Sequence, residues 1–222
     1  MKKQIRNISG FPELANPTDS VRVAIEKYSR SDMIVFDIGA NIGAMTGVFS
    51  SLTKTVVAFE PVPECVQRIK SRNLANVTVV QSAVSDVVGD ATFYMDQRPD
   101  LNKVGSSLRQ IEDIRDVTKA ITVSVTTIDD FVSRSNLKPD FIKIDVEGCK
   151  ELVIKGGIKT ILEHRPYMIF EVWGYNWPRF EPIISGLEKI YRFERASNGN
   201  DALLDYRSGL ITETDDVICI PK

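Results

Sequence analysis

Cysteine and histidine are scarce in this sequence. Its 222 residues include three cysteines, which lie far apart without a C-x-x-C pair, and a single histidine. Neither a zinc site nor a disulfide framework fits such a composition. We therefore expect Cys65, Cys149 and Cys219 to be reduced thiols with mainly structural roles.

Long apolar runs and an excess of basic charge are also missing. No apolar run approaches the ~20 residues of a membrane-spanning helix. The basic start MKKQIRN is followed by Pro12 and Pro17, where a signal peptide would have its apolar core. A net charge of -2 gives no sign of the basic face on which nucleic-acid-binding proteins rely. We expect a soluble, cytoplasmic protein without a membrane span and without a nucleic-acid partner. A homodimer stays open as an alternative to a monomer.

The length suits one domain with its own hydrophobic core. A chain of 222 residues buries roughly 70% of its extended surface and needs no disulfide or metal ion to fold. We predict an N-terminal helical extension over residues 1–31 and a single domain over residues 32–222.

Short β-rich runs alternate with amphipathic segments along most of the chain. This alternation predicts an α/β fold with a mainly parallel sheet that helices cover on both faces. The strand candidates are residues 33–39, 55–61, 76–84, 141–148 and 167–173, and the helix candidates are residues 43–52, 62–74, 127–134, 149–163 and 178–189.

Two regions depart from this alternation. Residues 90–96 and 121–127 are β-like and predict an added β element, and the polar segment 97–118 between them predicts a loop or lid. Near the end, residues 190–197 and 215–221 are β-like without a helix between them. A parallel return needs a longer connection, so this last pair should be antiparallel.

A glycine-rich turn follows the first strand candidate in "DIGANIG". The spacing of Gly39 and Gly43 lacks the middle glycine of a dinucleotide fingerprint, so the ligand need not carry a pyrophosphate. Glu60 ends the next strand, about twenty residues further on, where an acidic side chain accepts hydrogen bonds from ribose hydroxyls. A nucleoside without a pyrophosphate points to S-adenosyl-L-methionine.

Several motifs together extend this interpretation. They are "VFDIGANIGAMTGVFS", "VVAFEPVPECVQRIKSRN", "VTVVQSAVSDVVGDATFY", "GSSL", "VTTIDDFV" and "DFIKIDVEGCKELVIKG". With them, residues 32–173 resemble the FkbM family of class I S-adenosylmethionine-dependent methyltransferases. The resemblance implies a Rossmann-like, seven-stranded sheet of order 3-2-1-4-5-7-6 with an antiparallel last strand. Residues 1–31 and 174–222 match loosely, and we expect them to encode substrate choice.

The resemblance also implies cofactor-binding roles for individual residues. Asp37, Gly39, Ala40, Asn41 and Gly43 would cradle the methionine portion of the cofactor. Glu60 would bind the ribose, with Pro61 and Val62 beside the adenine. Ser82, Ala83 and Asp86 would lie near the adenine amino edge, and Asp145 would also contact the cofactor.

A hydroxyl acceptor is a poor nucleophile at neutral pH, so a general base or a metal ion should activate it. Three carboxylates at strand ends, Asp145, Glu147 and Glu171, are the catalytic candidates. Asp145 or Glu147 could be the base, or Asp145 and Glu171 could hold Mg²⁺, as in the related catechol and macrocin O-methyltransferases. Alternatively, Asp145 contacts only the cofactor's amino group and Glu147 caps the following helix.

Acceptor contacts are predicted for Ser106 and Ser107 of "GSSL" and for Trp173, and Lys143 is expected to pair with one of the carboxylates. The leading hypothesis is an O-methyltransferase acting on a hydroxyl of a small molecule or glycan, such as a sugar or polyketide. The alternatives are an N- or C-methyltransferase and a non-catalytic nucleoside-binding module.

Overall fold

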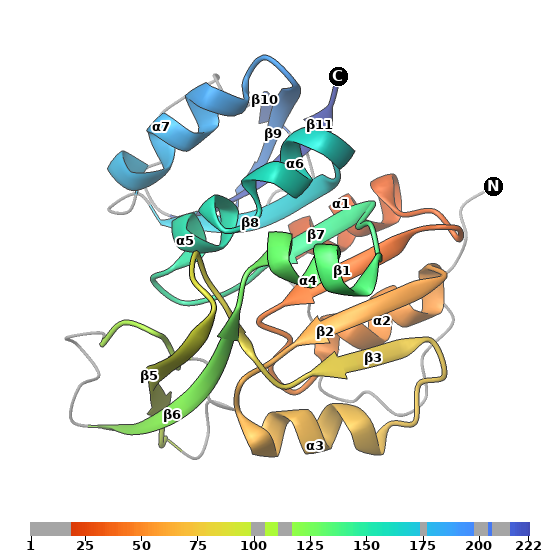
Figure 1. The fold of residues 1–222 in the computed structure, drawn as a ribbon. Helices are drawn as coiled ribbons and strands as arrows, with labels where there is room; N and C mark the ends of the chain where they lie inside the picture. Colours follow the sequence, from red (N-terminus) through yellow and green to blue (C-terminus); the bar gives the residue numbers. More distant parts are fainter. Residues whose placement is uncertain (1–18, 99–104, 111–116, 174–176, 198–203, 206–213) are drawn as a thin grey trace.

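The computed structural model describes residues 19–98, 105–110, 117–173, 177–197, 204–205 and 214–222 (Figure 1). Its main sheet has eight strands in the order β10-β9-β11-β8-β7-β1-β2-β3. These strands are β1 (Ile34–Ile38), β2 (Thr55–Phe59), β3 (Val77–Val80), β7 (Phe141–Ile144), β8 (Tyr167–Trp173), β9 (Tyr191–Ser197), β10 (Leu204–Asp205) and β11 (Thr214–Pro221).

The strand directions confirm the predicted topology. Strands β1, β2, β3, β7 and β8 are paired in parallel, whereas β11 is antiparallel to both β8 and β9. The predicted order 3-2-1-4-5-7-6 with an antiparallel last strand is therefore present. The short strand β10 extends the sheet by pairing with the outer edge of β9.

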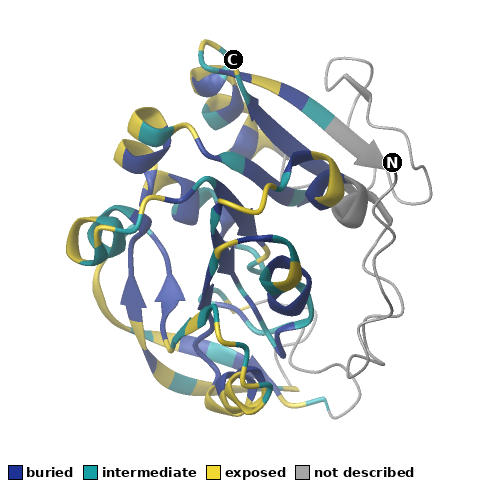
Figure 2. Ribbon diagram, turned by 90° about the vertical axis from the view of Figure 1, so that its right-hand side faces the viewer, coloured by how far each residue is buried: buried dark blue, intermediate teal, exposed yellow. Residues whose placement is uncertain are grey.

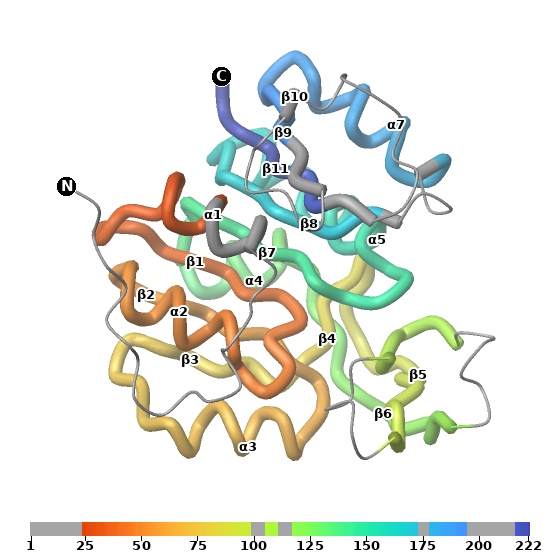
Figure 3. The backbone as a smooth tube through the Cα atoms, turned by 180° about the vertical axis from the view of Figure 1, so that it is seen from behind, coloured from red at the N-terminus to blue at the C-terminus, as the bar shows by residue number. Residues whose placement is uncertain are grey.

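Helices cover both faces of this sheet. They are α1 (Asp19–Tyr28), α2 (Ala44–Leu52), α3 (Pro63–Ser71), α4 (Ile128–Ser135), α5 (Lys150–Lys155), α6 (Ile158–His164) and α7 (Trp177–Leu187). Helices α4 to α7 lie in front of the sheet in Figure 1, and α1 and α2 lie on the opposite face, which Figure 3 shows from behind. In the described parts of the chain, every helix falls short of the length and apolarity that a membrane crossing demands.

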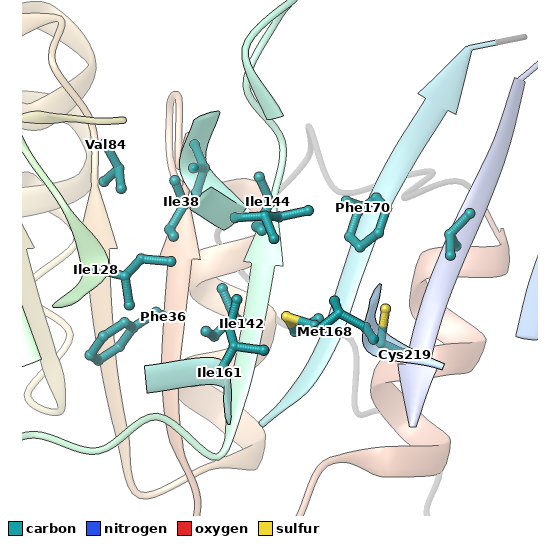
Figure 4. Packing of buried hydrophobic residues seen from close by; sticks show 14 of the residues in the cluster. Phe36, Ile38, Val84, Ile128, Ile142, Ile144, Ile161, Met168, Phe170 and Cys219 are labelled. Carbon is teal, nitrogen blue, oxygen red and sulfur yellow. The ribbon is translucent and has the colours of Figure 1, made fainter. Parts of the chain in front are cut away.

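Successive strand residues point to opposite faces, so the sheet separates two hydrophobic cores. On one face, Phe36, Ile142 and Met168 pack with Ile128 of α4 and Ile161 of α6 (Figure 4). The central strands are buried on both faces, which explains why they are continuously apolar.

On the other face, Val35, Phe141 and Ile169 pack with Ile25 of α1 and Phe49 of α2. Figure 2 shows the result as buried central strands and helices with one exposed side.

A second, smaller sheet confirms the predicted β element between strands 3 and 4 of the fold. It consists of β4 (Ala83–Val84), β6 (Thr118–Thr126) and β5 (Gly89–Asp96) in the order β4-β6-β5. Figures 1 and 3 show β5 and β6 beside the main sheet, on the side toward which β2 and β3 point. The predicted loop or lid at 97–118 lies largely outside the described residues.

Two predicted elements are each divided in the structure. Residues 149–163 form α5 and α6 instead of one helix, with Gly156 and Gly157 between them. Gly156 lies so close to Ser85, the residue after β4, that a Cβ there would be 2.0 Å from the Ser85 carbonyl oxygen. The predicted strand 76–84 is likewise divided into β3 and β4.

Candidate active site

A pocket opens at the carboxyl ends of β1, β2 and β7, where the main sheet meets the second sheet. It encloses about 770 Å³ of empty space, with the open solvent at its mouth included. Open α/β sheets bind ligands at this edge. The pocket is lined by Gly39, Asn41, Phe59, Glu60, Pro61, Ser82, Ala83, Val84, Phe93, Ser106, Ser107, Leu108, Asp145, Val146, Glu147 and Cys149.

The glycine turn after β1 is pressed against the end of β7. Gly39 has a φ of +76°, and a Cβ on it would be 2.1 Å from the carbonyl oxygen of Asp145. The backbone N–H groups of Gly39 and Ala40 both donate to the Phe59 carbonyl at 3.0 Å. Only glycine combines this left-handed conformation with so close an approach, so the sequence motif is explained by the local packing.

Glu60 follows β2 and is held by the glycine turn. The backbone N–H of Asn41 donates to its Oε2 and that of Val62 donates to its Oε1, both at 2.8 Å. Burial raises the pKa of Glu60 to about 7, although the two backbone N–H groups partly oppose the shift. Each carboxylate oxygen keeps a further lone pair, so Glu60 can also accept hydrogen bonds from ligand hydroxyls.

Lys143 of β7 links that strand to the neighbouring β1 at the centre of the sheet. Its Nζ lies 3.1 Å from Asp37 Oδ1 and 3.3 Å from Asp145 Oδ2, and it donates to the Gly39 carbonyl at 3.4 Å. Burial alone would lower the pKa of Lys143, but the two aspartates outweigh it and raise that pKa above its ordinary value. The predicted pairing of Lys143 with a carboxylate is confirmed, and it involves two carboxylates.

Asp37 is completely buried and does not line the pocket. Besides Lys143, it accepts a hydrogen bond of 2.6 Å from the Thr46 hydroxyl of α2. Asp37 was predicted to cradle the cofactor's methionine portion. In the structure it pairs with Lys143, which also donates to the Gly39 carbonyl, and its contact with the cofactor stays a prediction.

Asp145 and Glu147 both line the pocket, but their environments differ. Partial burial would raise the pKa of Asp145, but the charges of Lys143 and Lys150 outweigh it and hold that pKa below its usual range. Burial raises the pKa of Glu147, and the nearby Asp145 and Glu171 carboxylates add to the shift while Lys150 opposes it. Two neighbouring carboxyl groups with opposite shifts suit different roles.

Glu147 does not cap the following helix. Helix α5 begins after Cys149, and no side-chain hydrogen bond caps its first turn. Within the described ranges, the Glu147 carboxylate has neither a hydrogen bond nor an ion pair, and its backbone carbonyl accepts the Ser107 hydroxyl at 2.5 Å.

The residues at the predicted Mg²⁺ site do not fit a divalent cation. Glu171 does not line the pocket, and its Oε2 lies 3.6 Å from Lys150 Nζ. Asp145 is paired with Lys143 at 3.3 Å, so each carboxylate already has a cationic neighbour. Among the described residues, no group of three or more His, Cys, Asp or Glu side chains is placed to hold a metal ion.

The structure brings only part of the predicted cofactor site to the pocket surface. Gly39, Asn41, Glu60, Pro61, Ser82, Ala83 and Asp145 line the pocket, whereas Asp37, Ala40, Gly43, Val62 and Asp86 do not. Asp86 instead pairs with Lys155 of α5 at 2.6 Å.

Of the predicted acceptor contacts, Ser106 and Ser107 line the pocket, and the side chain of Trp173 lies outside the described residues. The missed lining residues are apolar or weakly polar: Phe59, Val84, Phe93, Leu108, Val146 and Cys149. Phe93 and Leu108 come from the second sheet and the segment beside it. Leu108 ends the "GSSL" motif from which the neighbouring serines were predicted, whereas nothing in the local sequence of Phe93 indicates that it reaches the pocket.

The sheet order, the glycine turn and the acidic residue after β2 together define a class I methyltransferase. The Methyltransferase FkbM domain model matches residues 37–197, and the chain therefore belongs to the FkbM methyltransferase family. Hexuronic acid methyltransferase AglP from Haloferax volcanii is 25% identical over 174 residues, which cover 77% of this chain and 68% of that protein.

Two crystal structures share the fold. Methyltransferase FkbM from Methylobacillus flagellatus has a TM-score of 0.58 and 18% identity, over 93% of this chain and 48% of that one. This chain thus spans about half the length of that methyltransferase. An rRNA methylase from Streptococcus thermophilus has a TM-score of 0.56 and 9% identity, over 93% and 98% of the two chains. At such low identities these likenesses show the fold alone.

Proposed function

We propose that this chain transfers a methyl group from S-adenosylmethionine to a hydroxyl group of a sugar or similar small molecule, with Glu147 as the general base. The observation that carries the proposal is that Glu60 and Glu147 line one pocket at the carboxyl edge of the sheet. The first can hold a ribose, and the second is a carboxyl group whose pKa is raised above its ordinary value by burial.

The pocket suits the cofactor on its own chemistry. Glu60 offers acceptor lone pairs to ribose hydroxyls, and the ionised Asp145 offers an acceptor to an ammonium group. Phe59, Pro61 and Ala83 add apolar surface for the adenine ring. When bound, S-adenosylmethionine supplies an activated methyl group.

The protein's own contribution to the reaction is alignment, exclusion of water and removal of one proton. The Glu147 carboxylate would take the proton from the acceptor hydroxyl as its oxygen becomes the nucleophile. A raised pKa makes a carboxylate a stronger base for this step, and burial shifts the pKa of Glu147 in that direction. Asp145 is less suited to it, because Lys143 and Lys150 stabilise its ionised form.

A sugar acceptor is favoured by the relative AglP, which is named a hexuronic acid methyltransferase. A nitrogen or carbon acceptor in the same pocket is the enzymatic alternative. The second alternative is a nucleoside-binding module without catalysis. In such a module the raised pKa of Glu147 would have no functional role.

The test is methyl transfer from labelled S-adenosylmethionine to a panel of nucleotide sugars, oligosaccharides and polyketides. We expect label on a sugar hydroxyl and equal rates with EDTA or Mg²⁺, because the candidate metal ligands are already paired with lysines. Loss of activity in EDTA with recovery in Mg²⁺ would instead establish the metal-assisted reaction. Label on nitrogen or carbon, or binding without turnover, would select one of the alternatives.

Glu60 should make cofactor binding depend on pH. A carboxyl group of pKa about 7 is about nine-tenths protonated at pH 6, so S-adenosylhomocysteine should bind up to about tenfold more weakly at pH 6 than at pH 8. The stability of the free protein should depend on pH in the opposite direction. The raised pKa of Glu60 means that its protonated form favours the folded state. This contribution to stability is lost as the pH rises from 4.5, the ordinary pKa of a glutamate, through about 7.

Calorimetry with S-adenosylhomocysteine at both pH values, and thermal unfolding of the free protein, would check this expectation. Glu60→Gln should weaken binding and remove both pH dependences, while Glu64→Gln, which is exposed on α3, should retain them. If the wild type binds equally well at pH 6 and pH 8, Glu60 does not accept hydrogen bonds from the ligand in its ionised form.

A further inference from the structure

The five residues that follow β7, Asp145 to Cys149, carry the proposed base without forming a helix or a strand. Gly148 in this loop has a φ of +66°, and regular hydrogen bonding resumes only in the short helix α5. A base must be held within a fraction of an ångström of its productive position to be effective. The loop therefore needs support from outside its own chain segment.

That support comes from residues 105–110, beside the second sheet. The Ser107 backbone N–H and carbonyl pair with Tyr94 of β5 at 3.0 and 2.8 Å, so Ser107 is fixed to that sheet. Its hydroxyl donates to the Glu147 carbonyl at 2.5 Å. Arg109 Nη1 donates to the Gly148 carbonyl at 2.8 Å and to Glu151 Oε1 at 2.6 Å.

The hydrogen-bonding capacity of Ser107 decides between a structural role and contact with a ligand. A serine hydroxyl has one donor and two acceptor lone pairs. The donor is used by Glu147, and one lone pair accepts the backbone N–H of Arg109 at 3.0 Å. Because its single proton is donated to Glu147, Ser107 has none left to donate to a cofactor or acceptor. Its side chain is also buried.

We propose that Ser107 and Arg109 are positioning residues that hold the Glu147 base in place through the loop's backbone carbonyls. The proposal rests on the proposed function for the role of Glu147, but the contacts themselves do not. The second sheet thus has a function in the reaction: it is the rigid support against which the loop carrying the base is fixed. Ser107 was predicted to contact the acceptor, and this assignment replaces that role.

The experiment compares Ser107→Ala and Arg109→Gln with two matched controls. The controls are Ser124→Ala, whose hydroxyl donates to Asp90 on the exposed side of the second sheet, and Arg134→Gln, whose ion pair with Asp130 lies on α4. We expect both test variants to lower kcat by about 10- to 100-fold, because small misplacements of a reacting group cost this much. The KM for the acceptor and the affinity for S-adenosylhomocysteine should stay within about twofold, and the controls should match the wild type.

The pH profile gives a readout that a loss of stability would not move. Burial raises the pKa of Glu147, and a loosened loop would expose the carboxyl group to water. The acidic limb of the kcat profile should therefore shift to lower pH in both test variants. An unchanged kcat with a raised KM for the acceptor would overturn the proposal in favour of direct substrate contact. So would an activity loss fully accounted for by unfolded protein.

Hydrogen exchange separates this proposal from the proposed function. In the complex with S-adenosylhomocysteine, amides of residues 145–149 should exchange at least about tenfold faster in Ser107→Ala than in the wild type. If they exchange faster but the wild type methylates no acceptor, the proposed function fails and the positioning role of Ser107 and Arg109 stands. If exchange is unchanged, the positioning role fails, whatever the activity.

Discussion

Lys143→Met is expected to lower the free energy of unfolding by about 3–5 kcal/mol, the usual result of removing one partner from a buried ion pair. Lys143 is the cationic partner of Asp37, which has no exposed surface. Methionine fills similar volume but leaves that aspartate charge uncompensated in the core. For a domain of this size, the loss corresponds to a fall in Tm of roughly 6–20 °C.

Thermal and urea unfolding measure this effect, and two further variants define its cause. The double variant Lys143→Met with Asp37→Asn should recover a large part of the lost stability, because it removes the unpaired charge. Lys155→Met, which breaks the exposed pair with Asp86, should cost less than about 1 kcal/mol. A double variant no more stable than Lys143→Met alone would show that lost packing, not the buried charge, causes the destabilisation.

The hydrophobic pattern alone predicted most of the main sheet, since each central strand is apolar on both faces and each helix on one. The antiparallel end followed from the sequence pattern, because no helix-like segment separates the β-like residues 190–197 and 215–221. Glu60 could be placed because parallel strands carry their carboxyl ends to one edge, so a polar residue at that point faces the ligand. These features depend on local sequence and on general rules of α/β folds.

Two contacts could not be predicted in this way: the pairing of Lys143 with Asp37, in addition to the predicted pairing with a strand-end carboxylate, and the contact of Ser107 with the Glu147 loop. Asp37 and Lys143 face one another across β1 and β7, although 106 positions separate them in the sequence. Ser107 contacts the Glu147 loop only because it is paired with β5 of the second sheet, which lies at the carboxyl edge of the main sheet. Such pairings are set by tertiary packing, and the local sequence around Arg109 or Phe93 contains no sign of them. The division between α5 and α6 differs in this respect, because the adjacent Gly156 and Gly157 are a local sequence signal for a helix break; only their close contacts with Ser85 and Ile128 come from tertiary packing.

Glu147→Gln is expected to lower kcat by about 10²- to 10⁴-fold, the usual contribution of a general base. Glutamine keeps the shape of the side chain but cannot take a proton. Affinity for S-adenosylhomocysteine should change little, because in the proposed complex Glu60 and the glycine turn, not Glu147, would hold the nucleoside. Glu163→Gln, which changes an exposed carboxylate on α6, is the matched control and should behave as the wild type.

The pH profile and a comparison with Asp145→Asn decide which carboxylate is the base. Burial raises the pKa of Glu147, so wild-type kcat should rise with pH along a limb centred above the ordinary glutamate value, and Glu147→Gln should lose that limb. Asp145 is held ionised by Lys143 and Lys150, so Asp145→Asn should weaken cofactor binding or stability and retain the limb. If Asp145→Asn abolishes the limb while Glu147→Gln preserves it, the base is Asp145. The lysines would then have to release a carboxylate that they now stabilise, at a cost in its basicity.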